Sequence, residues 1–192
     1  MFKRVYSRLN IIRFVPHALF YFMKKNEISL DIKRCKEHHD IDVNGLSGLL
    51  YLLTFDKSFR AVFYFRIGLW SNLISFLAPS FDSLMINSHS KIGHSALFVH
   101  AFSTIINHNG IGDNFRITHG CTIGNSKGGR PIIKNNVTIH TGAIIFGDIV
   151  IGNNVIIGAG SVINKSVPDN CVVIGNPAYI IKKGDNKTCE KL

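Results

Sequence analysis

Acidic residues are scarce in this chain of 192 residues, which holds 12 Asp and Glu against 22 Lys and Arg and has a formal net charge of +10. A basic excess of this size favours anionic partners, such as a phosphorylated cofactor, an acidic polymer or a membrane surface. Helix-turn-helix, zinc-finger and RNA-recognition signatures are absent, so nucleic acid is not an expected partner.

Cysteines in metal-binding or redox spacing are also missing. No CxxC or CxxH pattern occurs, which argues against a zinc site and a disulfide framework, so we expect a reducing cytoplasm and no bound metal. The N-terminus does not read as a signal peptide, because charges interrupt its apolar run and no small-residue cleavage site follows. The four cysteines are Cys35, Cys121, Cys171 and Cys189.

Long uncharged apolar runs are lacking too. The longest apolar stretch, residues 61–78, contains Arg66 near its middle, which predicts a buried amphipathic helix and not a membrane span. Glycine is sparse in the first part of the chain, where apolar residues follow helical spacing. We therefore expect several helices over residues 1–84, with Pro16 and Pro79 as helix breakers.

The second part of the chain contains a six-residue repeat. Aliphatic or aromatic residues recur every six positions, and small or β-branched residues often stand four places after them. A short strand and a turn fill such a unit, so three units make one turn of a parallel β-helix with coils about 4.8 Å apart. The residues expected to point inward are Ile86, Ile92, Phe98, Ile105, Ile111, Ile117, Ile123, Ile133, Ile139, Ile145, Ile151, Ile157 and Ile163.

Two interruptions of the repeat have structural consequences. One extra residue precedes Ile105, and the longer insertion "GNSKGGRPI" predicts a glycine-rich loop over residues 124–132. An insertion must leave the wall of a β-helix, and loops of this kind usually carry function. The sequence therefore predicts a β-helix over residues 85–175 with a protruding loop, followed by a tail segment over residues 176–192.

Several stretches resemble the hexapeptide-repeat acyltransferase family: the repeat, "FYFRIGLW", "FVHAFSTII" and the closing "VIIGAGSVINKSVPDNCVVIGNPAYIIKK". The chain is most similar to the serine acetyltransferase-like branch, in variants associated with polysaccharide O-acetylation. The resemblance implies a mainly β protein with an α-helical N-terminal part, built on a left-handed parallel β-helix. It also implies a bacterial, cytoplasmic enzyme that takes acetyl-CoA and forms a homotrimer or a dimer of trimers.

Three departures from the serine acetyltransferase pattern bear on the acceptor. Met85 and Val99 stand where those enzymes have aspartates, and Arg130 is followed by Pro131 where they have a histidine. The resemblance therefore implies an O-acetyltransferase that modifies a sugar hydroxyl in capsular, O-antigen or exopolysaccharide biosynthesis. A serine O-acetyltransferase of cysteine biosynthesis is the alternative.

Two other functions are compatible with a β-helix and less favoured. A zinc carbonic anhydrase needs three converging histidines, and His89 and His94 have no evident third partner. A non-catalytic scaffold would have no need of the histidine-bearing "FVHAFSTII" stretch or of the "GNPA" closing motif.

His100 is the best candidate for a general base. Acetyl transfer to an alcohol needs a group that takes the hydroxyl proton near neutral pH, and histidine suits that task. His100 occupies the third place of its six-residue unit, which is expected to face outward near a corner. His119 occupies the same place three units downstream and His140 lies one coil further, so both are additional catalytic candidates. Arg130 is the candidate substrate contact of the projecting loop.

The resemblance also implies that the closing coils bind acetyl-CoA. The backbone of Ala159 and the side chain of Lys165 match positions that contact CoA in similar sugar acetyltransferases. Lys182 matches a basic residue that meets the adenosine phosphates, and Thr141 and Gly142 lie one coil below Ala159.

The N-terminal segment is strongly basic. Residues 1–36 hold nine Lys or Arg against two acids, which is compatible with peripheral attachment to a membrane surface. The competing interpretation is a basic helix packed within the protein's own trimer.

Overall fold

The computed structural model describes residues 2–87, 91–126 and 128–192 and divides the chain into two compact units. Unit 1 covers residues 1–82 and is helical, whereas unit 2 covers residues 83–192 and consists of strands and turns. None of the helices in the described ranges is long and apolar enough to cross a membrane.

Unit 1 contains six α-helices and two short 3₁₀ helices in its described part. The expected single helix over residues 61–78 is wrong, because α5 ends at Ile67 and is followed by Gly68, whose φ of 63° breaks helical geometry. The expectation that Pro16 breaks a helix is also wrong, since Pro16 lies inside α2, where core packing of neighbouring side chains supports the helix on both sides of it. The elements are α1 (Phe2–Leu9), α2 (Ile11–Met23), α3 (Lys25–His39), α4 (Gly45–Phe55), α5 (Lys57–Ile67), η1 (Gly68–Trp70), α6 (Ser71–Ile74) and η2 (Ser75–Leu77).

Arg60 and the pair Asp31–Arg66 are charged groups within the buried part of unit 1. The guanidinium of Arg60 donates to the carbonyls of Leu53 (2.6 Å) and Thr54 (2.7 Å), which satisfies acceptors at the C-terminal end of α4. Arg66 binds Asp31 through two bonds, Nε–Oδ2 at 2.8 Å and Nη2–Oδ1 at 3.1 Å. This bidentate pair joins α3 to α5, and both side chains are almost fully buried.

His17 on α2 lies in the same core with a defined protonation state. The hydroxyl of Tyr64 donates to the carbonyl of Ala78 (2.8 Å), so it accepts a hydrogen bond from Nε2 of His17 at 2.9 Å. Nδ1 of His17 has no hydrogen-bond partner among the described residues. Burial, followed by the positive charges of Arg13 and Arg60, lowers the pKa of His17 to about 4.

Mild acid is expected to destabilise unit 1 through His17. Its pKa is about 4 in the folded chain against an ordinary 6.5, so the unfolded chain takes up the proton first as the pH falls. Above pH 6.5 the imidazole is neutral in both the folded and the unfolded chain, and the free energy of unfolding is at its full value. It falls between pH 6.5 and 4, by at most roughly 3 kcal/mol. Urea unfolding across this interval measures the effect, and His17→Gln should flatten the pH dependence. Equal pH dependence in both proteins would contradict the assignment.

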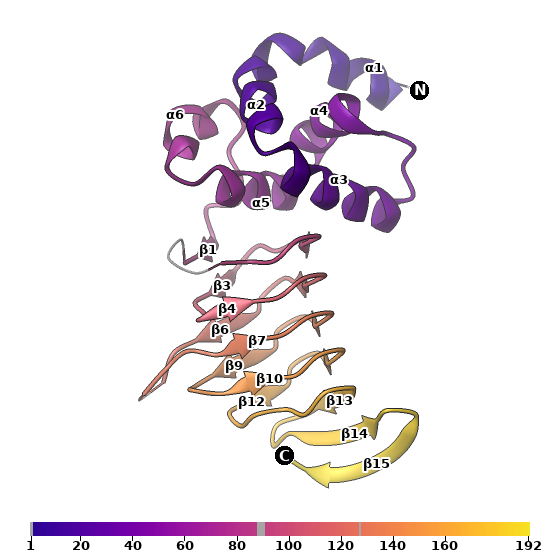
Figure 1. Cartoon of the computed structure of the whole chain (residues 1–192), viewed down its shortest axis with the longest axis vertical. Coiled ribbons are helices and arrows are strands. Elements are labelled where there is room, and N and C mark those ends of the chain that lie inside the picture. Colours follow the sequence, from indigo (N-terminus) through magenta and orange to yellow (C-terminus); the bar gives the residue numbers. More distant parts are fainter. Residues whose placement is uncertain (1, 88–90, 127) are drawn as a thin grey trace. The chain divides into compact units, whose positions relative to one another are not determined.

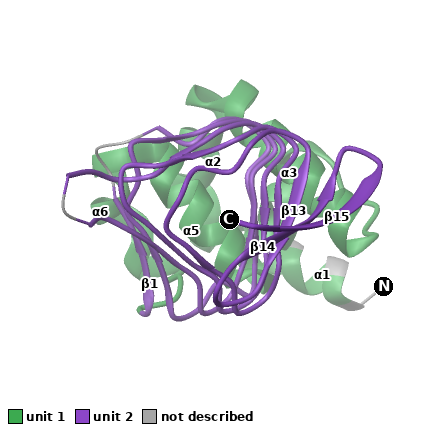
Figure 2. Cartoon of the chain, turned by 90° about the horizontal axis from the view of Figure 1, so that it is seen from below, with its two compact units in different colours: residues 1–82 green, residues 83–192 purple. Residues whose placement is uncertain are grey.

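Unit 2 is the predicted parallel β-helix, and the prediction is confirmed. Its strands form sheet A in the order β1-β3-β6-β9-β12, sheet B in the order β10-β7-β4, and sheet C in the order β15-β14-β13-β11-β8-β5-β2. The chain visits A, B and C in turn, so each circuit adds one coil to the stack seen in Figure 1. Figure 2 looks along the stack and shows the coils of unit 2 superimposed on one another.

The strands are short, as a six-residue unit requires, except at the C-terminal end. They are β1 (Leu84–Ile86), β2 (Leu97–Val99), β3 (Thr104–Ile106), β4 (Gly110–Ile111), β5 (Arg116–Thr118), β6 (Thr122–Gly124), β7 (Ile132–Ile133), β8 (Thr138–Ile139), β9 (Ile144–Phe146), β10 (Val150–Ile151), β11 (Ile156–Ile157), β12 (Val162–Ile163), β13 (Cys171–Ile174), β14 (Tyr179–Lys183) and β15 (Asn186–Lys191).

The interior of the β-helix is a column of aliphatic side chains, as the repeat predicts. Ile117, Ile123 and Ile139 are fully buried, and parallel pairing aligns Ile117 with Ile139. The inward orientation expected for Ile105 is wrong, since Ile105 is 43% exposed and Ile106 is fully buried. The expectation of one extra residue is also wrong: the corner before β3 holds two residues more than the same corner of the following coil. The inward position therefore moves from Ile105 to Ile106.

A ladder of asparagine side chains stacks along one corner of the coils. Nδ2 of Asn114 donates to Oδ1 of Asn136, Asn136 donates to Asn154, and Asn154 donates to Asn170, at 2.8–2.9 Å. All four residues have φ between 56° and 59°, a left-handed conformation that asparagine tolerates better than most residues. The ladder therefore fixes the turn at this corner from one coil to the next.

The C-terminal end of unit 2 departs from the repeat. After the last parallel strand, β13 pairs antiparallel with β14, and β14 pairs antiparallel with β15. The expected tail over residues 176–192 is thus an ordered hairpin that extends sheet C.

Candidate functional site

The corner between sheets C and A, called here the C–A corner, brings His100 and His119 together. It comprises residues 100–103, 119–121, 140–143 and 158–161 of successive coils. Val99 at the end of β2 is paired with Thr118 at the end of β5, so the two histidines that follow them are neighbours in adjacent coils. His100 is exposed and His119 is half-buried.

Phe102 gives this corner a feature that the sequence analysis missed. Its ring stacks on the imidazole of His119, with centroids 4.9 Å apart and planes inclined by 12°. The amide of Phe102 donates to the carbonyl of His100 (2.7 Å), and the amide of Gly120 donates to the carbonyl of Phe102 (3.0 Å). These bonds order the widened corner, in which His100 itself has a φ of 49°. The sequence did carry a signal, because Phe102 stands where the repeat has small residues.

His140 belongs to the same corner but to a different row. Ile139 is paired with Ile117, which places His140 beside Thr118 and Thr141 beside His119. The hydroxyls of Thr118 and Thr141 lie 3.1 Å apart, which agrees with this register. The column that starts at His100 therefore continues through His119 to Thr141, and His140 stands one residue out of it.

Three glycines form a second column along the C–A corner. Gly120, Gly142 and Gly160 follow one another in successive coils with φ of 68°, 71° and 65°. A Cβ atom at Gly160 would meet nothing within 4 Å, and one at Gly142 would approach only the backbone of Gly160, at 3.9 Å. This strip of backbone carries no side chain, and the exposed Ala159 adjoins it. An extended ligand could therefore approach the backbone closely here.

The two candidate lysines lie away from the C–A corner in sequence. Lys165 follows β12, is exposed, and donates from Nζ to the carbonyl oxygen of Leu192 at 3.0 Å. Lys182 lies on β14, where its Nζ is 3.8 Å from a carboxylate oxygen of Asp185. Both ammonium groups are at the surface near the C-terminal hairpin. Each contacts an oxygen of the chain itself, which the phosphate of a ligand could replace.

Arg130 lies at a different corner of the same chain. Its Nη1 is 3.4 Å from Oδ1 of Asn107, which also accepts from Nδ2 of Asn87 at 2.9 Å. Asn107 and Arg130 follow sheet A strands, whereas His100 precedes one, so the width of sheet A separates the loop from the histidine pair. In the described part of the loop, Ser126 and Gly129 exchange two backbone hydrogen bonds of 3.1 Å, which close it into a tight turn. A single chain does not bring Arg130 to His100.

Over the described ranges, no group of three or more His, Cys, Asp or Glu side chains could hold a metal ion. His89, which the sequence analysis weighed as a zinc ligand, lies outside the described residues.

Comparison with known proteins identifies the family. Residues 130–165 match the family model described as bacterial transferase hexapeptide (six repeats). The serine acetyltransferase of Buchnera aphidicola subsp. Schizaphis graminum is 34% identical over 176 residues, which cover 84% of this chain and 66% of that enzyme. The Escherichia coli K12 protein named "Putative colanic acid biosynthesis acetyltransferase WcaB" is 40% identical over 112 residues, which cover 56% of this chain and 69% of WcaB.

Solved structures agree with these relatives. The crystal structure of serine acetyltransferase from Brucella abortus strain S19 in complex with coenzyme A has a TM-score of 0.69 and 25% identity, covering 92% of this chain and 74% of that one. The chain belongs to the hexapeptide-repeat acyltransferase family, and unit 2 is its left-handed β-helix. It spans two thirds or less of the length of the curated serine acetyltransferases that it matches.

Proposed function

We propose that the chain is an acetyl-CoA-dependent O-acetyltransferase with His100 as general base. The observation that carries the proposal is the C–A corner, where an exposed histidine adjoins a strip of side-chain-free backbone. Residues 85–175 form the proposed catalytic domain. Support for the donor comes from the similar Brucella abortus serine acetyltransferase, which was solved in complex with coenzyme A.

In the proposed reaction, an imidazole nitrogen of His100 takes the proton of the acceptor hydroxyl while the oxygen attacks the thioester carbonyl. A C–O bond forms, the C–S bond breaks, and the proton moves from His100 to the departing thiolate. His119 lies beside His100, and its ring is held by Phe102. His119 therefore serves as a second polar group near the reacting atoms, and backbone N–H groups of the corner stabilise the oxyanion.

For the donor, we assign Thr141, Gly142 and Ala159 to the pantetheine arm and Lys165 and Lys182 to the phosphates. The corner backbone at Gly142 and Gly160 has no side chain that would block an extended ligand. The two lysines supply cations, which suits a donor that carries several phosphates. His140 is a less favoured catalytic candidate, because it stands out of the His100–His119 column.

The relatives favour serine over the sugar acceptor expected from sequence, and we propose L-serine as the first acceptor. Serine acetyltransferases supply the match that covers 84% of this chain and the similar coenzyme A complex. A sugar hydroxyl is the second candidate. It is supported by the likeness to WcaB and by Met85 and Val99, which offer no carboxylate to bind a free amino acid.

We also propose a homotrimer, with a dimer of trimers as the larger assembly that the family resemblance implies. In one chain, His100 lies before the sheet A strands and Arg130 lies after them, so the two are separated by the length of a strand. If Arg130 contacts the substrate, it therefore has to do so beside the His100 of a neighbouring copy. A cytoplasmic enzyme agrees with a cytosolic acetyl donor and with the unpaired state of all four cysteines.

Release of free thiol from acetyl-CoA, followed with a thiol-reactive dye, tests the function. Rates are compared with L-serine, with capsule-type oligosaccharides and without acceptor. Release that depends on serine supports the first candidate, and release that depends only on oligosaccharide supports the second. Absence of release with any hydroxyl acceptor would overturn the proposal of an O-acetyltransferase.

A further inference from the structure

Helix α2 carries a row of exposed apolar side chains, called here the apolar stripe. Its members recur at intervals of three or four residues, so they lie on one side of the helix. Their exposed fractions range from 51% to 84%. The apolar stripe consists of Ile12, Val15, Leu19, Phe22 and Met23.

The opposite side of α2 faces the core of unit 1. Phe14, His17 and Tyr21 are buried there, so the core accounts for only one side of the helix. The apolar stripe on the other side has no cover among the described residues, and contiguous exposed apolar side chains of this kind mark interaction sites. Leu9, the last residue of α1, is also exposed (74%).

The segment around the apolar stripe is uniformly basic. Residues 1–26 contain six Lys or Arg and no Asp or Glu, and the first acid in the chain is Glu27. Lys24 and Lys25 directly follow the apolar stripe at the turn between α2 and α3. Apolar side chains flanked by cations are the pattern of a helix that lies in the interface of an anionic membrane.

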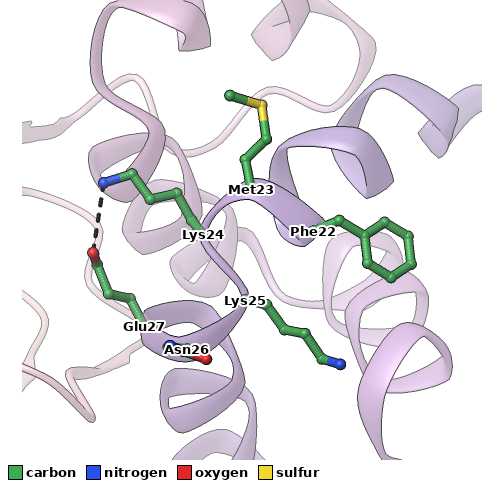
Figure 3. A pocket seen from close by; sticks show the side chains of 6 residues that line it. All are labelled: Phe22, Met23, Lys24, Lys25, Asn26 and Glu27. Atoms are coloured by element: carbon green, nitrogen blue, oxygen red, sulfur yellow. Dashed lines mark hydrogen bonds and ion pairs between the residues drawn. The ribbon is translucent and has the colours of Figure 1, made fainter.

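The α2–α3 turn, residues 22–27, combines both features in one place (Figure 3). Phe22 and Met23 project outward from the end of α2, and Lys24 and Lys25 extend to opposite sides of the turn. Lys24 contacts Glu27 at 3.5 Å, whereas Lys25 points away from that carboxylate. These residues line an open hollow of about 310 Å³, next to which a lipid phosphate could meet Lys25.

We propose that the apolar stripe and the α2–α3 turn dock on a bilayer surface that contains anionic phospholipid. Phe22 and Met23 enter the acyl boundary, while Lys24 and Lys25 stay at the level of the phosphates. A second copy of this chain is a poorer occupant. Two such segments that pair with each other, in either orientation, would bring cations against cations, because residues 1–26 hold no acid to balance them.

Co-sedimentation of the full chain with phosphatidylcholine vesicles, with and without phosphatidylglycerol, tests the proposal. Binding is expected only with phosphatidylglycerol, and it should weaken as salt is raised. Lys24→Gln together with Lys25→Gln should lower the partition coefficient by about 30-fold, the effect of two lysines at an anionic surface. Phe22→Gln together with Met23→Gln should lower it at least about tenfold.

Two matched variants serve as controls. Lys187→Gln with Lys191→Gln removes the same charge from exposed positions of the C-terminal hairpin. Leu69→Gln with Leu73→Gln changes two other apolar residues of unit 1 that are at least as exposed as Phe22. Both should bind vesicles like the unchanged protein. Absence of binding, or equal losses in controls and test variants, would overturn the proposal. So would a change of oligomer mass in light scattering for Phe22→Gln with Met23→Gln, since that result assigns the apolar stripe to a contact between copies. Vesicle binding is measured without either substrate, so its failure is separate from failure of the acetyltransferase assignment.

Discussion

Replacing His100 by asparagine is expected to lower kcat for acetyl transfer by about 10²- to 10⁴-fold, the usual contribution of a general base. Asparagine is the informative substitution because it accepts the left-handed backbone, φ 49°, that His100 adopts. It retains polarity and cannot take up a proton near neutral pH. The KM for acetyl-CoA should change little, since the donor is assigned to other residues of the C–A corner.

His94→Asn is the matched control. His94 is an exposed histidine of unit 2 whose contact with Asp113 uses its backbone amide, at 2.7 Å, so the substitution leaves that hydrogen bond in place. It should keep normal kcat. Stopped assays with the accepted substrate measure both variants, and circular dichroism checks the fold. An unchanged kcat in His100→Asn would move the base to His119 or His140.

Replacing Asp31 by alanine is expected to lower the free energy of unfolding of unit 1 by about 3–5 kcal/mol. Removal of the carboxylate leaves the guanidinium of Arg66 buried without the partner that binds it through two hydrogen bonds. Desolvation of an unbalanced charge then opposes folding. Urea unfolding followed by circular dichroism measures the loss.

Two further proteins separate the buried charge from other effects of this substitution. Asp31→Leu combined with Arg66→Met removes both charges and should recover most of the stability, because well-packed apolar residues can replace a buried ion pair. Glu27→Ala breaks the solvent-accessible contact of 3.5 Å with Lys24 and should lower the free energy of unfolding by no more than about 1 kcal/mol. A small loss in Asp31→Ala would show that water or another group compensates Arg66.

The β-helix could be predicted because each coil repeats the same constraint. Ile117, Ile123 and Ile139 each fill an inward position. A non-aliphatic residue at one of these positions would have interrupted the six-residue repeat in the sequence. Ile105 was misplaced for a physical reason. The extra residues before it lie in a corner, where the backbone widens without a change in side-chain character, so the sequence does not reveal how many of them the corner takes up.

The candidate site could be predicted in part. The three-unit spacing correctly indicated that His119 lies one coil after His100, since coils stack in register. The stacking of Phe102 on His119 depends on how the widened corner folds back, which no spacing rule describes. A single chain keeps Arg130 away from the histidines, so their relation rests on the proposed oligomer, which composition cannot show. In unit 1 the end of α5 depended on one residue, Gly68, within a long apolar run.

The C-terminal hairpin bears on behaviour at high concentration. A stack of parallel coils ends in a row of unsatisfied backbone groups, and such an edge is a template for strand addition and fibre growth. In sheet C the hairpin occupies that edge and replaces the parallel pattern by an antiparallel one. Its outer strand, β15, presents Lys187 and Lys191 at exposed positions, which repel another strand of the same kind. At this end of sheet C the hairpin therefore limits the chain to its own coils and opposes end-to-end polymerisation.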